Sequence, residues 1–190
     1  MNEASTGRPA SGAQQPPPTP PILRRFLGAI DSFTDWTGWL IAFLLVPLMI
    51  TVVAEVFGRY MMGRSLFWSY DVIYMLYGSL FMLGAAYTLL HKGHIRSDFI
   101  YVSLPVRWQG LIDTVAYVGF FFPVMFFLLW YGWDNFQDAV RLNERSIHSA
   151  WGPVLYPFRA VIPLAALMLL VQGLSETTKS LHALITGRWP

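Results

Sequence analysis

Residues 39–57, WLIAFLLVPLMITVVAEVF, decide the fold class of this chain. The run is predominantly apolar and is close to the ~20 residues that an α-helix needs to cross the hydrocarbon core of a bilayer. Its proline, Pro47, is tolerated as a kink in a membrane helix when neighbouring groups satisfy the freed carbonyl. The stretch therefore predicts a first membrane-spanning helix.

Three further apolar stretches predict three more spans, at about residues 68–90, 110–133 and 153–174. Tryptophan and tyrosine gather near their ends, at the depth that amphipathic rings prefer in a bilayer. Over the whole chain 13% of residues are charged, against roughly 25% in a soluble domain. We therefore expect an all-α integral membrane protein with four transmembrane helices. Gly78 and Gly84 are small sites at which another helix could approach the second span closely.

The segments outside the spans differ in composition. Residues 1–21 form a proline-rich, low-complexity tail, which we expect to be disordered. Residues 22–38 place apolar side chains at helical spacing with charged residues between them, which favours an N-terminal interfacial amphipathic helix. An early start of the first membrane helix explains the same pattern equally well. The four-helix membrane domain then covers residues 39–185, and residues 186–190 form a short tail.

The lysine and arginine residues indicate the orientation of the chain in the membrane. They lie between apolar blocks rather than along one stripe, so the net charge of +2 reflects topology and not nucleic-acid binding. The positive-inside rule favours both termini in the cytoplasm, because that orientation places more of the basic residues inside. The inner set is then Arg8, Arg24, Arg25, Lys92, Arg96, Arg107, Lys179 and Arg188, and the outer set is Arg59, Arg64, Arg141, Arg145 and Arg159.

Residue types that carry catalysis or bind cofactors are missing from the expected membrane interior. The chain has no cysteine, which excludes thiolate ligands and thiol nucleophiles. None of its four histidines (His91, His94, His148 and His182) falls at mid-membrane, where a haem-bearing anchor needs its axial ligands. No nucleophile-elbow, zinc-protease or phosphate-loop motif occurs. We therefore expect no enzyme activity, no catalytic residue, no bound metal and no cofactor.

Two polar features lie at the ends of the spans. Glu55 and Arg59 are four residues apart and share one helix face, so they can form an ion pair that ends the first span. Contact with a partner subunit explains them equally well. Asp71 begins the second span, where the positive end of the helix dipole stabilises a carboxylate. We favour this structural role for Asp71 over a role as a proton relay.

Motifs around the first two spans resemble those of a known family. Residues 55–60 (EVFGRY) and 66–71 (LFWSYD) resemble the end of the first helix and the start of the second in the small membrane subunits of TRAP transporters. These DctQ-type subunits belong to the tripartite ATP-independent periplasmic transporters. Residues 94–98 (HIRSD) are similar to the family motif after the second span. The family usually has glutamate at the position of Asp71 and an apolar residue at Ser97.

The last span carries the rest of the resemblance, which covers roughly residues 22–185. Asn143-Glu144 before the span, residues 157–159 (PFR) at its start and residues 172–176 (QGLSE) at its end resemble one branch of the family. A lysine is more usual at the position of Arg159.

The resemblance implies a function that the spacing alone does not. A small subunit of this family lies in the bacterial inner membrane as a multi-pass protein, surrounded by lipid. It pairs with a large permease subunit, which holds the substrate and sodium sites. A periplasmic substrate-binding protein delivers an organic acid, and the small subunit braces the large one during sodium-coupled uptake.

The resemblance also suggests roles for particular residues. We expect five of them to make structural or subunit-interface polar contacts: Glu55, Arg59, Asp71, Arg96 and Asp98. Four others face outward and are candidates for docking the periplasmic binding protein: Arg141, Glu144, Arg145 and Arg159.

Two other functions remain open at the level of sequence. A membrane anchor subunit of a respiratory or other multi-subunit complex also has four helices and short loops. A self-sufficient carrier or channel is the second alternative. It is disfavoured because the deep parts of the spans are nearly free of charge, whereas transport pathways use polar sites near the midplane.

Overall fold

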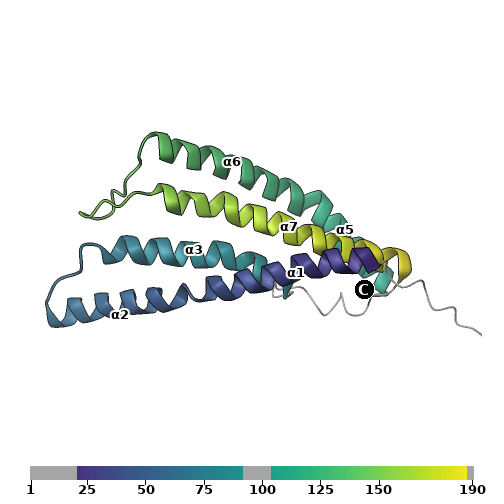
Figure 1. Ribbon diagram of the computed structural model, residues 1–190, viewed down its shortest axis with the longest axis horizontal. Helices are drawn as coiled ribbons and strands as arrows, with labels where there is room; N and C mark the ends of the chain where they lie inside the picture. The colour runs from purple at the N-terminus through teal and green to yellow at the C-terminus, as the bar shows by residue number, and fades with distance from the viewer. Residues whose placement is uncertain (1–20, 92–103, 188–190) are drawn as a thin grey trace, which may run out of the picture.

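The computed structural model describes residues 21–91 and 104–187, apart from the side chains of residues 21–24 and 26. Every regular element in these two ranges is a helix, as expected (Figure 1). The elements are α1 (Pro21–Ala42), α2 (Leu45–Met61), α3 (Ser69–Leu90), α5 (Val106–Ala116), the π-helical turn η1 (Tyr117–Phe121), α6 (Phe122–Arg141) and α7 (Tyr156–Thr186). Four helical stretches are long and apolar enough to cross a membrane: Leu27–Met61, Ser69–Leu90, Val106–Arg141 and Tyr156–Thr186. The predicted proline-rich tail of residues 1–21 lies outside the described residues except for Pro21.

Helices α1 and α2 follow one another end to end (Figure 1). They are separated by a tight turn in which the amide of Leu44 bonds the carbonyl of Ile41 at 2.9 Å. Pro47 has no amide hydrogen for the carbonyl of Phe43, which accepts instead from Val46 at 3.1 Å. The break therefore lies four residues beyond the predicted boundary between residues 22–38 and 39–57. The position of α1 relative to the membrane surface stays a prediction.

The third predicted span, residues 110–133, is part of a longer run made of α5, η1 and α6. Pro123 lies in the first turn of α6 and cannot donate to a carbonyl in the preceding turn. The wider π turn just before it accommodates this missing hydrogen bond without ending the helix. At its other end the helix continues for about two turns beyond Trp133, to Arg141.

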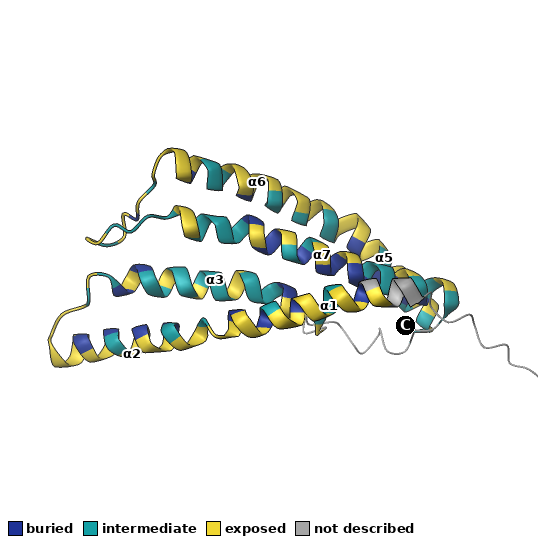
Figure 2. Ribbon diagram, in the orientation of Figure 1, coloured by how far each residue is buried: buried dark blue, intermediate teal, exposed yellow. Residues whose placement is uncertain are grey.

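Helix α7 is the centre of the fold. It packs against α1, α3, α5 and α6. Of its most apolar stretch 39% is buried, more than in any of the other three spanning helical stretches. The core comprises Ala86 and Leu89 of α3, Tyr117 of η1 and Leu169 of α7. By contrast, the outer faces of α2 and α6 are mostly exposed (Figure 2). Large exposed apolar side chains suit a surface solvated by lipid or covered by a partner, not one that faces water.

Glycines set the closest helix contacts. A methyl group added at Gly110 would lie 2.7 Å from the backbone nitrogen of Leu184, so only glycine lets α5 pack against the backbone of α7. Gly78 fits the prediction of a close approach, since an added methyl group would meet the ring of Phe158 at 2.8 Å. Gly84 does not approach another helix: nothing lies within 4 Å, and it lines an open groove between α1 and α3.

Candidate functional site

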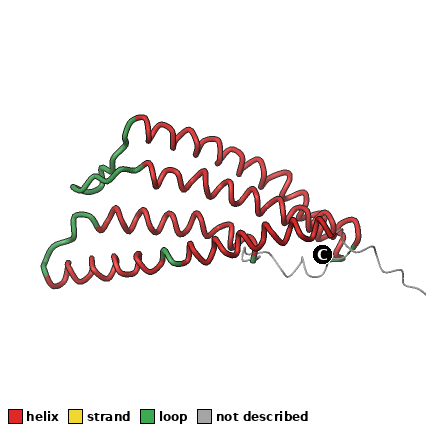
Figure 3. Tube along the Cα trace, in the orientation of Figure 1, coloured by secondary structure: helices red, strands yellow, loops and turns green. Residues whose placement is uncertain are grey.

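The α2–α3 and α6–α7 connections lie at one end of the molecule, whereas the short turn between α1 and α2 lies partway along it (Figure 3). We call this end, which holds the α2–α3 and α6–α7 connections, the loop end. The first half of α1, α5 and the end of α7 lie at the opposite end, and α3 ends short of it (Figure 1). Ion pairs and side-chain hydrogen bonds form separate networks at the two ends, and these networks are the candidate site.

Glu55 ties the end of α2 to the start of α3. Its carboxylate accepts hydrogen bonds from Arg59 at 2.8 Å, from the amide of Leu66 at 2.9 Å and from the hydroxyl of Ser69 at 2.6 Å. The predicted intrahelical ion pair is therefore present, and it is joined by two bonds that fix the connection. The Arg59 side chain is 64% exposed, so the ion pair alone contributes at most about 1 kcal/mol.

Asp71 fixes the connection between α6 and α7, which we call the α6–α7 loop (residues 142–155). The side chain lies in the first turn of α3, as the helix-dipole interpretation requires, and the residue is only 1% exposed. Its two oxygens accept hydrogen bonds from Ser146 at 2.5 Å and from Ser149. The two serine hydroxyls in turn accept from the amides of His148 and Trp151 at 3.2 Å. The buried carboxylate of Asp71 on α3 thus holds the loop that joins α6 to α7.

The α6–α7 loop also has backbone order of its own. Arg145 and Val154 form an antiparallel β-bridge, and the amide of Ser146 bonds the carbonyl of Pro153 at 2.9 Å. The loop reverses through Gly152, whose φ of 54° lies in the left-handed region that favours glycine. The loop is therefore a hairpin closed near its base by the bridge between Arg145 and Val154.

The four residues predicted to dock a binding protein fall into two classes. Arg159 of α7 pairs with Glu144 at 2.8 Å and donates a second hydrogen bond to Asn135 of α6, so this pair joins the two helices. Arg141 and Arg145 are exposed. Arg145 has no side-chain partner within the described ranges, and a nitrogen of Arg141 lies 4.0 Å from Asp138.

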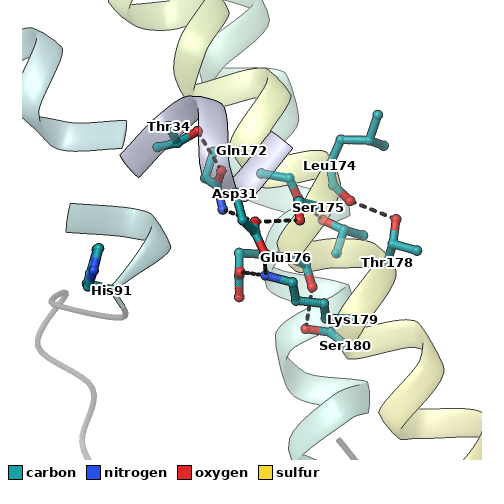
Figure 4. Close-up of polar contacts among 12 residues, drawn as sticks. Asp31, Thr34, His91, Gln172, Leu174, Ser175, Glu176, Thr178, Lys179 and Ser180 are labelled. Atoms are coloured by element: carbon teal, nitrogen blue, oxygen red, sulfur yellow. Dashed lines mark hydrogen bonds and ion pairs between the residues drawn. The ribbon is translucent and has the colours of Figure 1, made fainter. Parts of the chain in front are cut away.

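The opposite end holds a second network, which the site prediction did not include (Figure 4). Asp31 of α1 accepts hydrogen bonds from three side chains of α7: Gln172 at 3.1 Å, Ser175 at 3.0 Å and Lys179 at 2.8 Å. Lys179 also pairs with Glu176 at 2.7 Å. The polar side of α1 at this position therefore faces α7.

Thr34 extends this network by one turn of α1, donating to the side-chain oxygen of Gln172 at 2.8 Å. Gln172, Ser175 and Glu176 come from the QGLSE motif and are buried. Their spacing, continued to Lys179, places all four on one face of a helix. This spacing in the sequence indicates a polar stripe along α7, but it does not identify α1 as the helix that contacts the stripe.

Two predicted contact residues, Arg96 and Asp98, lie outside the described residues. His91 contacts Asp35 of α1 at 3.7 Å, while its predicted neighbour His94 is also outside. Across residues 21–91 and 104–187, no group of three or more His, Asp or Glu side chains could hold a metal ion.

The fold and these networks define a class of protein: a multi-pass membrane protein whose buried carboxylates bind its own helices and loops together. Comparison with known proteins narrows this class. Residues 48–182 match the family described as tripartite ATP-independent periplasmic transporters, DctQ component. The chain belongs to this family, the small permease subunits of TRAP transporters.

A relative in Halomonas elongata supports the assignment. The ectoine TRAP transporter small permease protein TeaB is 33% identical to this chain over 160 residues. The matched region covers 84% of this chain and 81% of the relative. Membership of a transporter family agrees with the expectation of a transport protein rather than an enzyme.

Proposed function

We propose that this chain braces the large permease subunit of a TRAP transporter during sodium-coupled uptake of an organic acid. The large subunit holds the substrate and sodium sites, and a periplasmic binding protein delivers the substrate. The chain lies in the bacterial inner membrane with both termini in the cytoplasm, so the loop end faces the periplasm. This orientation follows the distribution of basic residues.

The observation that best supports the bracing role is that side-chain hydrogen bonds join the helices to one another at both ends. At the loop end, Asp71 of α3 is bonded to the α6–α7 loop and Arg159 of α7 is bonded to α6. At the opposite end, Asp31 of α1 is bonded to α7. Interactions that join all the spanning helices resist relative motion, which is what a static support for a moving subunit needs.

The outer faces of α2 and α6 are the surfaces available to the large subunit and to lipid. On α2 the exposed side chains include Met49, Val53 and Phe57, and on α6 they include Phe127 and Trp130. Helix α2 packs mainly against α3, so its far side is open along the whole helix. Contact with a large apolar partner is consistent with this surface.

Co-expression with the large subunit tests the proposal. The two chains are expected to co-purify, and proteoliposomes containing both are expected to take up substrate when a sodium gradient and the binding protein are supplied. Ectoine and a panel of organic acids are the substrates to compare, since the relative is named for ectoine. Liposomes with the large subunit alone are the control. Failure to co-purify, or transport by this chain alone, would contradict the proposal.

A further inference from the structure

The α6–α7 loop presents apolar side chains on a fixed backbone. Ile147, two residues after the bridge residue Arg145, is 91% exposed, and Leu142 and Trp151 are 78% and 47% exposed. The residues on either side of Ile147 hold the loop in place: Ser146 bonds the carboxylate of Asp71, and the ring of His148 lies 5.9 Å from that of Tyr70. A preorganised loop loses little conformational entropy when a partner covers it, which favours binding.

In the orientation proposed above, we expect the loop to lie beyond the hydrocarbon region of the bilayer. Helix α6 continues from Trp133 to Arg141, which at the α-helical rise places the loop roughly 12 Å past the aromatic residues at the end of the apolar run. These last turns carry the exposed acids Asp134 and Asp138. An irregular loop with free backbone polar groups is also excluded from the lipid interior. A partner that covers the loop would therefore be a protein on the aqueous side, not an acyl chain.

The charge around Ile147 indicates what kind of protein surface fits it. The nearby carboxylate of Glu144 is paired with Arg159, and that of Asp71 is buried under the loop. Arg145, two residues before Ile147, remains exposed without a side-chain partner within the described residues. Arg141 at the end of α6 bonds Gln137 at 3.3 Å and lies 4.0 Å from Asp138, so Arg145 is the cation available to a partner. An exposed apolar side chain near an unpaired arginine complements an apolar pocket with a carboxylate at its rim.

We propose that the α6–α7 loop is the docking element for a water-soluble protein, with Ile147 entering an apolar pocket and Arg145 pairing with its acidic rim. This inference rests on the proposed function, under which the partner is the soluble substrate-binding protein. It assigns Glu144 and Arg159, which the sequence placed with the docking residues, to the support beneath the loop. Asp71 is a positioning residue for the same loop.

The test measures binding of the soluble protein to the complex of large and small subunits in lipid nanodiscs. Ile147→Asp is expected to raise the dissociation constant by about tenfold or more, because a charge replaces an apolar anchor. Arg145→Glu is expected to weaken binding by a factor that shrinks as salt increases. Met62→Asp, which places the same charge on an exposed residue of the α2–α3 connection, is the matched control and is expected to leave binding unchanged. Equal affinity for wild type and Ile147→Asp would overturn the inference.

A second readout separates docking from insertion into lipid. Because the chain has no cysteine, Ile147→Cys gives a single labelling site when the large subunit is made cysteine-free. An environment-sensitive dye at this site is expected to change its emission when the soluble protein is added. Quenching by spin-labelled lipid instead would place this site in the membrane and overturn the inference. Co-purification of the two membrane subunits is checked first, so a failure of the proposed function is recognised separately.

Discussion

The carboxylate of Asp31 accepts hydrogen bonds from three α7 side chains, and Lys179 is the cation that it shares with Glu176. The group therefore contains two carboxylates and one ammonium. The effect of a mutation therefore depends on which charge it removes. Removing one carboxylate leaves a neutral pair, whereas removing the ammonium leaves two like charges together and partly desolvated.

Replacing Lys179 with methionine is accordingly expected to be much more destabilising than Asp31→Asn, although each removes the same ion pair. Breaking a buried pair costs about 3–5 kcal/mol, and somewhat less here because the Lys179 and Asp31 side chains are 20% and 28% exposed. Asp31→Asn keeps the Lys179–Glu176 pair and an oxygen for Gln172, so we expect a cost of about 1 kcal/mol. Thermal unfolding followed by tryptophan fluorescence in detergent compares the two variants. Equal losses of Tm would contradict the charge assignment.

The elements of the fold differ in how far the sequence predicted them. The apolar stretches predicted four spans correctly, but not the lengths of the helices: α6 runs on to Arg141 and α7 to Thr186. The length of an apolar stretch is set by the thickness of the membrane. A helix can extend beyond that stretch when its polar side chains are hydrated or bonded to other groups. The QGLSE motif crosses the predicted end of the last span at residue 174, and Asp31 and Thr34 of α1 supply its partners.

The site was predicted less completely than the fold. The Glu55–Arg59 pair was predicted because four-residue spacing fixes it locally. The contacts of Asp71 with Ser146 and Ser149 were not, since they join residues that are 75 and 78 positions apart. A single sequence carries no signal for such a pairing.

The contact between α5 and α7 gives a prediction at the scale of elements. Gly110→Ala adds a methyl group 2.7 Å from the backbone nitrogen of Leu184 and 2.8 Å from the carbonyl oxygen of Ser180, so the helices must separate. We expect a loss of about 1–3 kcal/mol, the usual cost of overpacking. Gly84→Ala is the matched control, because its methyl group meets nothing within 4 Å and alanine is the better helix former. The stability of the two variants is compared by thermal unfolding, and equal Tm values would contradict this close packing.

At the scale of the whole molecule, the networks at the two ends join the helix pair α2–α3, the helix pair α6–α7 and α1 into one body. A ring contact between two spanning helices agrees with this picture: the rings of Tyr74 on α3 and Phe158 on α7 lie 5.0 Å apart between their centres. If the chain acts as a static brace, this contact persists throughout transport. If the chain takes part in the motion, the two helices must move apart or slide in each cycle.

Covalent cross-linking of α3 to α7 tests this central claim most directly. Tyr74→Cys and Phe158→Cys are introduced together into the chain, which has no other cysteine, and are joined by a short bifunctional thiol reagent. The variant is reconstituted with a cysteine-free large subunit and the binding protein, and uptake is measured before and after cross-linking. A static brace predicts the same initial rate of uptake in both states. Loss of uptake on cross-linking, and its recovery when a cleavable reagent is cut, would contradict that role.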